Sequence, residues 1–137
     1  MLKAEDKLLI HELLSRCAYG YDERDLDLLV SCFAPDAMMT LRVARGDLIG
    51  PFQGRTALGE MFKNAMDSQH DVRRHIISNI FFKEDGEAPV VCSNLTLVAT
   101  EEGNISLVTA GIYTDRVELS DEGWVVKNRH LDLDRPH

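Results

Sequence analysis

The hydrophobic period of this chain changes once, near residue 74, and that change restricts the folds it can adopt. Before it, apolar residues recur at helical spacing, which predicts three helices. They cover residues 4–21, 25–33 and 54–69. After it, segments rich in Val, Ile, Thr, Leu and aromatic residues alternate with acidic, Gly-containing turns, which predicts four strands. They cover residues 74–83, 89–100, 105–119 and 123–133.

Helices first and strands afterwards indicate an α+β fold, not a series of βαβ units. We expect one short extra strand around residues 37–41, with Gly50 and Pro51 acting as breakers after it. The 137 residues suffice for a single domain spanning 1–137. A long antiparallel meander has to curve to cover three helices, and the space between helices and sheet is then the natural ligand pocket.

Charge excludes two classes of partner. The chain carries 15 Lys and Arg against 23 Asp and Glu, a net charge of −8. That balance argues against a nucleic-acid binder, which needs a basic stripe, and against docking on an anionic membrane. No stretch approaches the roughly 20 apolar residues of a membrane helix. Cys17, Cys32 and Cys92 form no close pair and lie in apolar stretches, so we expect buried free thiols and a cytoplasmic protein.

Two segments carry residues suited to chemistry. Tyr19, Tyr21 and Asp22 lie where the first predicted helix meets the second, with Asp25 as a plausible N-cap for that second helix. His75 opens the first long strand. Alternation along a strand predicts that His75, Ile77, Asn79 and Phe81 share one face, which would be an apolar face with a few polar groups.

These segments resemble one family. The runs Tyr21–Leu29 and Cys32–Pro35, together with Arg74, His75 and Asn79, are similar to the opening helices and first long strand of scytalone dehydratase and other SnoaL-like proteins of the nuclear transport factor 2-like superfamily. The last two strands of these proteins are matched by Gly111–Arg116, Gly123-Trp124 and Asn128-Arg129.

The resemblance implies a cone-shaped α+β barrel, with three helices packed on a curved, mostly antiparallel sheet of the cystatin-like type. It also implies roles for particular residues. In scytalone dehydratase and in the similar hexachlorocyclohexane dehydrochlorinase, an Asp from the first helix pairs with a His on the sheet, and these positions fall on Asp22 and His75. The same comparison gives Tyr21 and Arg129 as catalytic candidates. Tyr19, Asn79 and Tyr113 complete the set as candidate substrate-binding residues.

Each assignment has a structural alternative. His75 alone would also fit a strand histidine bonded to a neighbouring carbonyl, and Asp22 a turn or cap residue. The three tyrosines would also fit core aromatics with a bonded hydroxyl. Arg129 either faces a ligand or pairs with Asp115 or Asp22. The run from His130 through Asp132 to Asp134 has metal-ligand spacing but no partner cluster, and solvated polar residues explain it better.

Two functions from different classes remain. The first is a cofactor-independent lyase or isomerase, dehydratase-like, in which Asp22 and His75 abstract a proton from a small apolar carbonyl compound, polycyclic or steroid-like. The second is a non-catalytic ligand-binding or assembly module, resembling the β subunit of aromatic-ring-hydroxylating dioxygenases. No nucleotide or nucleophile motif is present, so we expect no cofactor and no metal. The predicted sheet is apolar on both faces, which predicts a homodimer or homotrimer.

Overall fold

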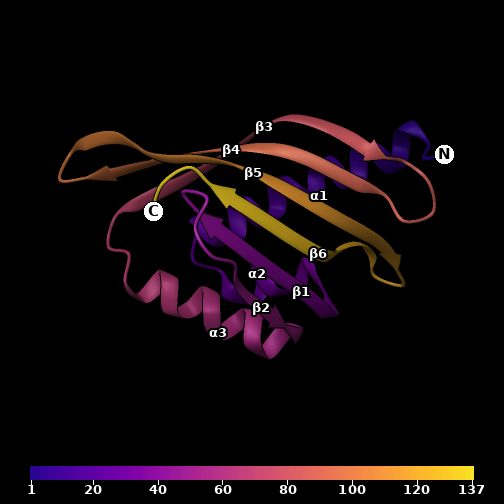
Figure 1. The fold of residues 1–137 in the computed structure, drawn as a ribbon, viewed down its shortest axis with the longest axis horizontal. Coiled ribbons are helices and arrows are strands. Elements are labelled where there is room, and N and C mark those ends of the chain that lie inside the picture. The colour runs from indigo at the N-terminus through magenta and orange to yellow at the C-terminus, as the bar shows by residue number, and fades with distance from the viewer.

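The computed structural model describes all 137 residues, which form three helices and six strands (Figure 1). In chain order they are α1 (Ala4–Asp22), α2 (Leu26–Ser31), β1 (Phe33–Val43), β2 (Ile49–Gln53), α3 (Gly54–Asp67), β3 (Val72–Glu84), β4 (Val90–Glu101), β5 (Asn104–Ser120) and β6 (Gly123–Leu133). The three predicted helices and the four predicted long strands are all present, with ends that differ by a few residues.

The strands form one sheet with the order β2–β1–β6–β5–β4–β3. Strands β3 to β6 are the predicted meander, and every neighbouring pair is antiparallel except β1 and β6, which run parallel. The sheet curves but does not close, because β2 and β3 are its two edges. The predicted α+β class is therefore confirmed, with an open sheet in place of the expected barrel.

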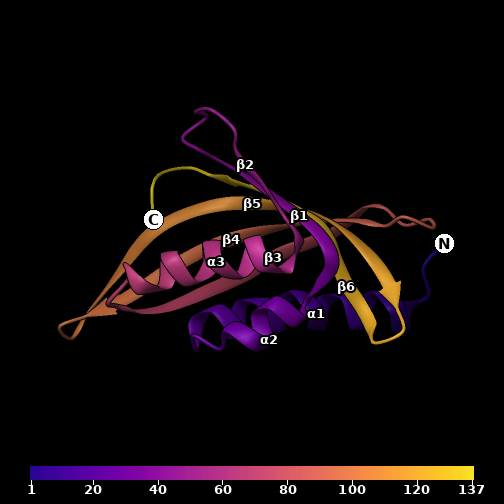
Figure 2. The same cartoon turned by 90° about the horizontal axis from the view of Figure 1, so that it is seen from below.

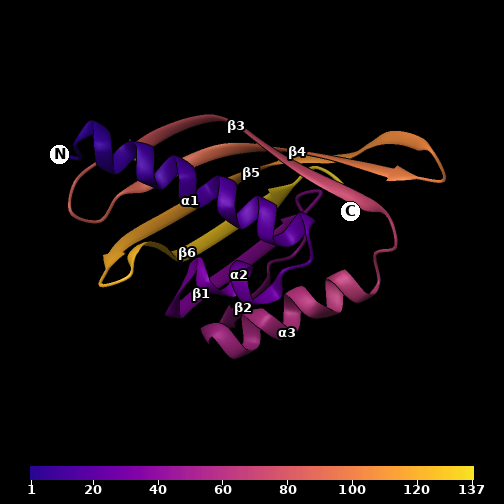
Figure 3. The ribbon, with the colours of Figure 1, turned by 180° about the vertical axis from the view of Figure 1, so that it is seen from behind.

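The helices lie on the concave side of this sheet. Seen edge-on, α1 and α2 lie beneath the arch of the strands, and no helix covers the opposite face (Figure 2). From behind, α1 crosses the sheet, and α3 lies beside the edge formed by β1 and β2 (Figure 3). The core between helices and sheet contains Ile10, Leu13, Leu14 and Phe33, each at most 1% exposed.

The turn from α1 to α2 is compact because Gly20 has no side chain. A Cβ on Gly20 would lie 3.0 Å from the backbone nitrogen of Leu29, so a larger residue would push the two helices apart. Arg24 adopts a positive φ of 55° in this turn. The Asp25 side chain then accepts a hydrogen bond from the backbone N–H of Leu28 at 3.1 Å, which confirms the predicted N-cap.

Two predicted boundaries were wrong near the middle of the chain. The second helix ends at Ser31, and β1 begins already at Phe33, so the expected short strand at 37–41 is part of an 11-residue strand. Gly50 and Pro51 do not merely break the chain, because they lie inside β2, which pairs with β1 at the sheet edge. An edge strand tolerates Pro, since one side of it has no partner.

The prediction that His75, Ile77, Asn79 and Phe81 share one face was also wrong. The pairing of β3 with β4 shifts register between Ser78 and Phe81, and Asn79 adopts a positive φ of 53° there. This bulge inserts one extra residue into β3 and reverses the alternation beyond it. His75 and Ile77 therefore face the concave side, whereas Phe81 is 58% exposed.

The uncovered face of the sheet is apolar over its outer strands. Register places Ile105 opposite Thr100, Leu107 opposite Val98 and Ile112 opposite Asn94, all on this face. The exposed large apolar side chains of β3 and β5 on this face are Val72, Ile76, Phe81, Ile105, Leu107 and Ile112.

Candidate active site

A cavity of about 250 Å³ lies between the helices and the concave face of the sheet. Eighteen of its 21 lining residues are hydrophobic, and the polar exceptions include His75, Arg129 and His137. An apolar wall with a few placed polar groups is the usual composition of a small-molecule site.

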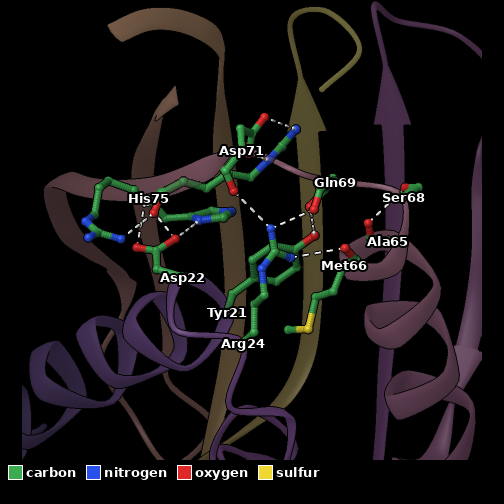
Figure 4. A network of polar contacts seen from close by, with 11 residues as sticks. Tyr21, Asp22, Arg24, Ala65, Met66, Ser68, Gln69, Asp71 and His75 are labelled. Atoms are coloured by element: carbon green, nitrogen blue, oxygen red, sulfur yellow. Dashed lines mark hydrogen bonds and ion pairs between the residues drawn. The ribbon is translucent and has the colours of Figure 1, made fainter. Parts of the chain in front are cut away.

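Asp22 and His75 are joined by direct hydrogen bonds at this cavity (Figure 4). Oδ1 of Asp22 lies 2.5 Å from Nδ1 of His75. The backbone N–H of His75 also donates to the same carboxylate, at 3.1 Å to Oδ1 and 2.9 Å to Oδ2. The Asp22 and His75 side chains are only 9% and 10% exposed, so this pair is shielded from water.

The fold brings these two residues together from positions 53 apart in the sequence. Asp22 is the last residue of α1, and His75 is the fourth residue of β3, the strand on which α1 packs. Because the carboxylate holds both the ring and the backbone of His75, it fixes the orientation of the imidazole as well as its position.

Nδ1 of His75 is occupied by Asp22, and Nε2 makes no hydrogen bond to the protein. His75 lines the cavity, and its ring centroid lies 4.8 Å from that of Tyr21. An imidazole with a carboxylate on one nitrogen and a free second nitrogen is the arrangement of a general base.

Tyr21 lines the cavity beside His75, and its hydroxyl donates to Oε1 of Gln69 at 2.7 Å. Burial raises the pKa of Tyr21, so the hydroxyl keeps its proton at neutral pH. The loop that carries Gln69 is held by Arg24, whose guanidinium donates to the backbone carbonyls of Met66, Gln69 and Asp71 (Figure 4). Arg24 thereby fastens the start of β3 to the end of α1.

Arg129 is paired with Asp115. The sequence left open whether Arg129 faces a ligand or pairs with Asp115 or Asp22. Nε of Arg129 donates to Oδ1 at 2.7 Å, and Nη2 donates to Oδ2 at 3.0 Å. Asp115 is 0% exposed and Arg129 only 7%. Burial opposes the charge on Arg129, but the adjacent Asp115 carboxylate outweighs it, so the pKa of Arg129 is raised. Nη1 remains without a protein acceptor.

Tyr113 lies against this ion pair. The guanidinium carbon of Arg129 is 4.0 Å from the centroid of the Tyr113 ring, a cation–π contact. Tyr113 lines the cavity, and its hydroxyl makes no hydrogen bond to the protein. Burial raises the pKa of Tyr113 to about 12, so this hydroxyl is a proton donor throughout the physiological range.

Two of the candidate residues lie outside the cavity, which corrects their expected role. Tyr19 is on the solvent side of α1, 60% exposed, because it is two residues from both Cys17 and Tyr21, whose side chains face inward. Asn79 is exposed on the β3 bulge. Neither position is suited to contact a ligand in this pocket.

His130 and Asp132 lie on the other face of the sheet, where the ring of His130 bonds Thr40 at 2.7 Å and Asp132 at 3.1 Å. These contacts fit the solvated polar residues expected from the sequence.

Two residues at the site were not identified from the sequence. Gln69 follows α3 and has no pattern around it that indicates a partner for Tyr21. His137 comes after the last strand, and only the course of the tail in space brings it to the cavity.

The fold and this pocket define a protein of the cystatin-like, nuclear transport factor 2-like class. The family model described as the SnoaL-like domain matches residues 3–130. The chain therefore belongs to the SnoaL-like family. Among curated proteins, none matches it significantly in sequence.

Solved structures support the fold. A Nostoc punctiforme protein of unknown function with a cystatin-like fold is 23% identical, with a TM-score of 0.82 over 97% of this chain and 94% of that chain. An NTF2-like protein from Novosphingobium aromaticivorans is 16% identical, with a TM-score of 0.76 over 94% and 82% of the two chains.

A third similar structure is the β subunit of a proposed aromatic-ring-hydroxylating dioxygenase from Novosphingobium aromaticivorans. It is 18% identical, with a TM-score of 0.78 over 93% of this chain and 88% of that chain. At these identities, the three likenesses show a shared fold only. Within the fold itself, none of the helices has the length and apolar character needed to cross a membrane.

Proposed function

We propose that this protein is a cofactor-independent lyase or isomerase that removes a proton from a small apolar carbonyl compound, with Asp22 and His75 as its catalytic pair. The observation that carries the proposal is the contact between Oδ1 of Asp22 and Nδ1 of His75 at 2.5 Å, beside an apolar cavity that His75 lines. This arrangement leaves Nε2 free for the substrate.

The pair supplies what carbon deprotonation requires. His75 Nε2 takes the proton from the carbon next to the carbonyl, and the C–H electron pair moves into a new C=C bond while the carbonyl oxygen becomes an enolate. The Asp22 carboxylate holds the ring in the tautomer with its proton on Nδ1 and balances the charge of the imidazolium that forms. In an apolar site the electrostatic attraction between the carboxylate and the imidazolium is stronger than in water.

The second half of the reaction uses the same proton. In dehydration, the enolate collapses and expels a β-hydroxyl group, which takes the proton from His75 and leaves as water. In isomerisation, the proton returns from His75 to the γ carbon and the double bond moves. Either course is complete without an added oxidant or reductant.

Two groups on the cavity wall, on Arg129 and Tyr113, have a free donor for the enolate oxygen. Arg129 has Nη1 free of a protein acceptor, and Tyr113 has an unbonded hydroxyl with a pKa raised to about 12. Tyr21 lies closer to His75, although its hydroxyl proton is donated to Gln69. Because Asp115 already neutralises Arg129, the site favours an oxygen that becomes negative during the reaction over a substrate that is charged from the start.

The cavity volume narrows the substrate class. At about 250 Å³ it lies just below the ~300–1,000 Å³ of typical ligand pockets. We therefore favour a compound with one or two rings over the steroid-sized molecules that the sequence left open. The cytoplasm is our proposed location, since Cys17, Cys32 and Cys92 are all free thiols.

A screen of β-hydroxy ketones and β,γ-unsaturated ketones tests this function. The appearance of a conjugated enone is followed by its ultraviolet absorbance, for wild type and His75→Ala. Turnover by wild type that is lost in His75→Ala supports the proposal. If compounds bind and stabilise both forms equally and none is turned over, a binding module replaces it.

The uncovered sheet face gives partial support to the second function, a non-catalytic binding or assembly module. Ile105 is 75% exposed and Leu107 is 68% exposed, and such a surface fits burial against another chain. The occupant we propose is a second copy, as a homodimer or homotrimer. A module that resembles a dioxygenase β subunit would instead place this face against a catalytic partner chain, and it would bind that chain equally well with or without His75.

A further inference from the structure

The chain beyond β6 turns back over the concave side of the sheet, and Thr109 holds it there. The backbone N–H of Asp134 donates to the carbonyl of Ala110 at 2.8 Å, which extends the β5–β6 ladder by one bond. The Thr109 hydroxyl then donates to the carbonyl of Arg135 at 2.9 Å and accepts from the N–H of Arg135 at 3.3 Å.

Thr109 itself is 3% exposed and alternates along β5 with residues of the open face. A buried hydroxyl that bonds the same residue twice fixes the course of the tail. This course carries the chain onward from Arg135 to the cavity, where His137 is one of the lining residues together with His75.

His137 is held in its neutral form at this place. His137 is an exposed residue overall, but partial desolvation of its ring, and then the nearby charge of Arg73, lower the pKa of His137. Arg73 is only 7% exposed. Nε and Nη2 of Arg73 donate hydrogen bonds to the Asp71 carboxylate, and the buried Nη1 has no acceptor. A neutral imidazole offers one donor and one acceptor nitrogen, and His137 makes no hydrogen bond to the protein with either.

We propose that His137 is a second ligand-contacting histidine, which hydrogen-bonds a polar group of the substrate other than the reacting carbonyl. The substrate class then becomes a small hydroxy ketone or diketone, with an apolar body between its two oxygen functions. Thr109 acts through the tail as a positioning residue. This inference rests on the proposed function for the identity of the pocket, but it concerns recognition and not proton abstraction.

The chemistry of the pocket explains why a second contact would be needed. In the proposed function, Arg129 and Tyr113 bind one oxygen function, while most of the remaining wall is apolar and allows the ligand to rotate. A hydrogen bond to the far end of the ligand fixes which carbon is presented to Nε2 of His75. A misplaced carbon is costly, because proton transfer requires a reacting distance of about 3 Å.

The test compares two matched probes, 2-tetralone and 6-hydroxy-2-tetralone, which differ by one hydroxyl group. Binding is measured by calorimetry for wild type, His137→Phe and His137→Gln, and thermal unfolding checks that each variant is folded. Wild type should bind the hydroxylated probe about fivefold more tightly, the effect of one hydrogen bond. His137→Phe should remove this preference without weakening 2-tetralone, and His137→Gln should retain part of it.

Thr109 provides the matched pair for the positioning role. Thr109→Val should reduce the preference for the hydroxylated probe. Thr109→Ser keeps the hydroxyl group and should therefore keep the preference of the wild type. A merely structural role for Thr109 would lower thermal stability without changing the ratio of the two affinities.

The outcomes separate this inference from the proposed function. If wild type binds both probes with equal affinity, or if His137→Phe keeps the preference, the His137 assignment is overturned while the Asp22–His75 proposal stands. If neither probe binds, the pocket assignment fails, and the His137 assignment fails with it. If the preference follows His137 but no ketone is ever deprotonated, His137 remains a ligand contact and the catalytic proposal alone is lost.

Discussion

The Asp22 carboxylate binds His75 at two levels, through the ring and through the backbone. Oδ1 lies 2.5 Å from Nδ1, and the backbone N–H of His75 donates to both oxygens at 3.1 and 2.9 Å. One side chain at the end of α1 thus sets the tautomer of the imidazole and the position of the strand that carries it. Its two roles can be separated by substitution.

Asp22→Asn should lower turnover by at least about 10²-fold while the protein stays folded. The amide oxygen still accepts a hydrogen bond from His75, but it does not balance the charge of the imidazolium. Asp22→Ala should lose the same activity and also about 1–3 kcal/mol of unfolding free energy, because the buried N–H of His75 then lacks an acceptor. Urea denaturation of the two variants measures this difference. Full activity in Asp22→Asn would remove Asp22 from the mechanism.

Asp115→Ala should destabilise the protein by about 3–5 kcal/mol, because it leaves the buried Arg129 guanidinium without its carboxylate. Replacing both partners, as in Asp115→Leu with Arg129→Met, should recover most of that loss, since no uncompensated charge remains. Denaturant unfolding of the single and double variants gives the comparison. A loss below about 1 kcal/mol for Asp115→Ala would mean that Arg129 finds water or another partner.

Tyr113 should make stability depend on pH in the alkaline range. Its pKa is raised to about 12 by burial, against 10.0 for an ordinary tyrosine. The folded state therefore holds the proton more tightly, and this contribution is complete below pH 10.0 and lost as pH rises toward about 12. A shift of this size corresponds to about 2–3 kcal/mol.

Tyr113→Phe removes the titrating group and is the control for this effect. Urea unfolding of both proteins from about pH 9 to about pH 12 should show wild type losing more stability than the variant. Parallel curves would mean that the Tyr113 hydroxyl is solvated and titrates normally.

The uncovered sheet face should mediate self-association. Light scattering at micromolar concentration should give a particle two or three times the 15.4 kDa chain mass. Leu107→Glu combined with Ile112→Glu should yield the monomer, because both side chains lie exposed on that face. Leu8→Glu is the matched control, since Leu8 is about as exposed as Leu107 but belongs to α1. A wild-type particle of 15.4 kDa would contradict the prediction.

The sequence predicted those parts of the fold that local patterns determine. Apolar spacing located all three helices, and acidic Gly-containing turns located the meander. The bulge at Asn79 could not be predicted from the sequence, because a register shift depends on how β3 pairs with β4 and not on β3 alone. That single feature removed Asn79 from the predicted pocket face. β2 was missed for a similar reason, since Pro51 is compatible with a strand only at the edge of a sheet.

The candidate site likewise contains residues that could be predicted from the sequence and residues that could not. The resemblance placed Asp22 and His75 correctly as neighbours, because it concerns elements whose packing defines the family fold. It gave no orientation for Tyr19, whose exposure follows from the rotation of α1 about its axis. It gave no sign of His137 either, because the course of the tail depends on its hydrogen bonds to Thr109 and Ala110 of β5.

Proton abstraction by His75 is the central claim, and exchange of the α-protons of 2-tetralone in deuterium oxide tests it without knowledge of the natural substrate. Deuterium incorporation is followed by NMR for wild type, His75→Ala, His75→Gln and Asp22→Asn, with a chelator present in a parallel series. Wild type should exchange faster than buffer, with or without the chelator, and both His75 variants should fall to the buffer rate while still binding the ketone. Exchange that persists in His75→Ala, or a wild type that binds the ketone and exchanges no faster than buffer, would contradict the account.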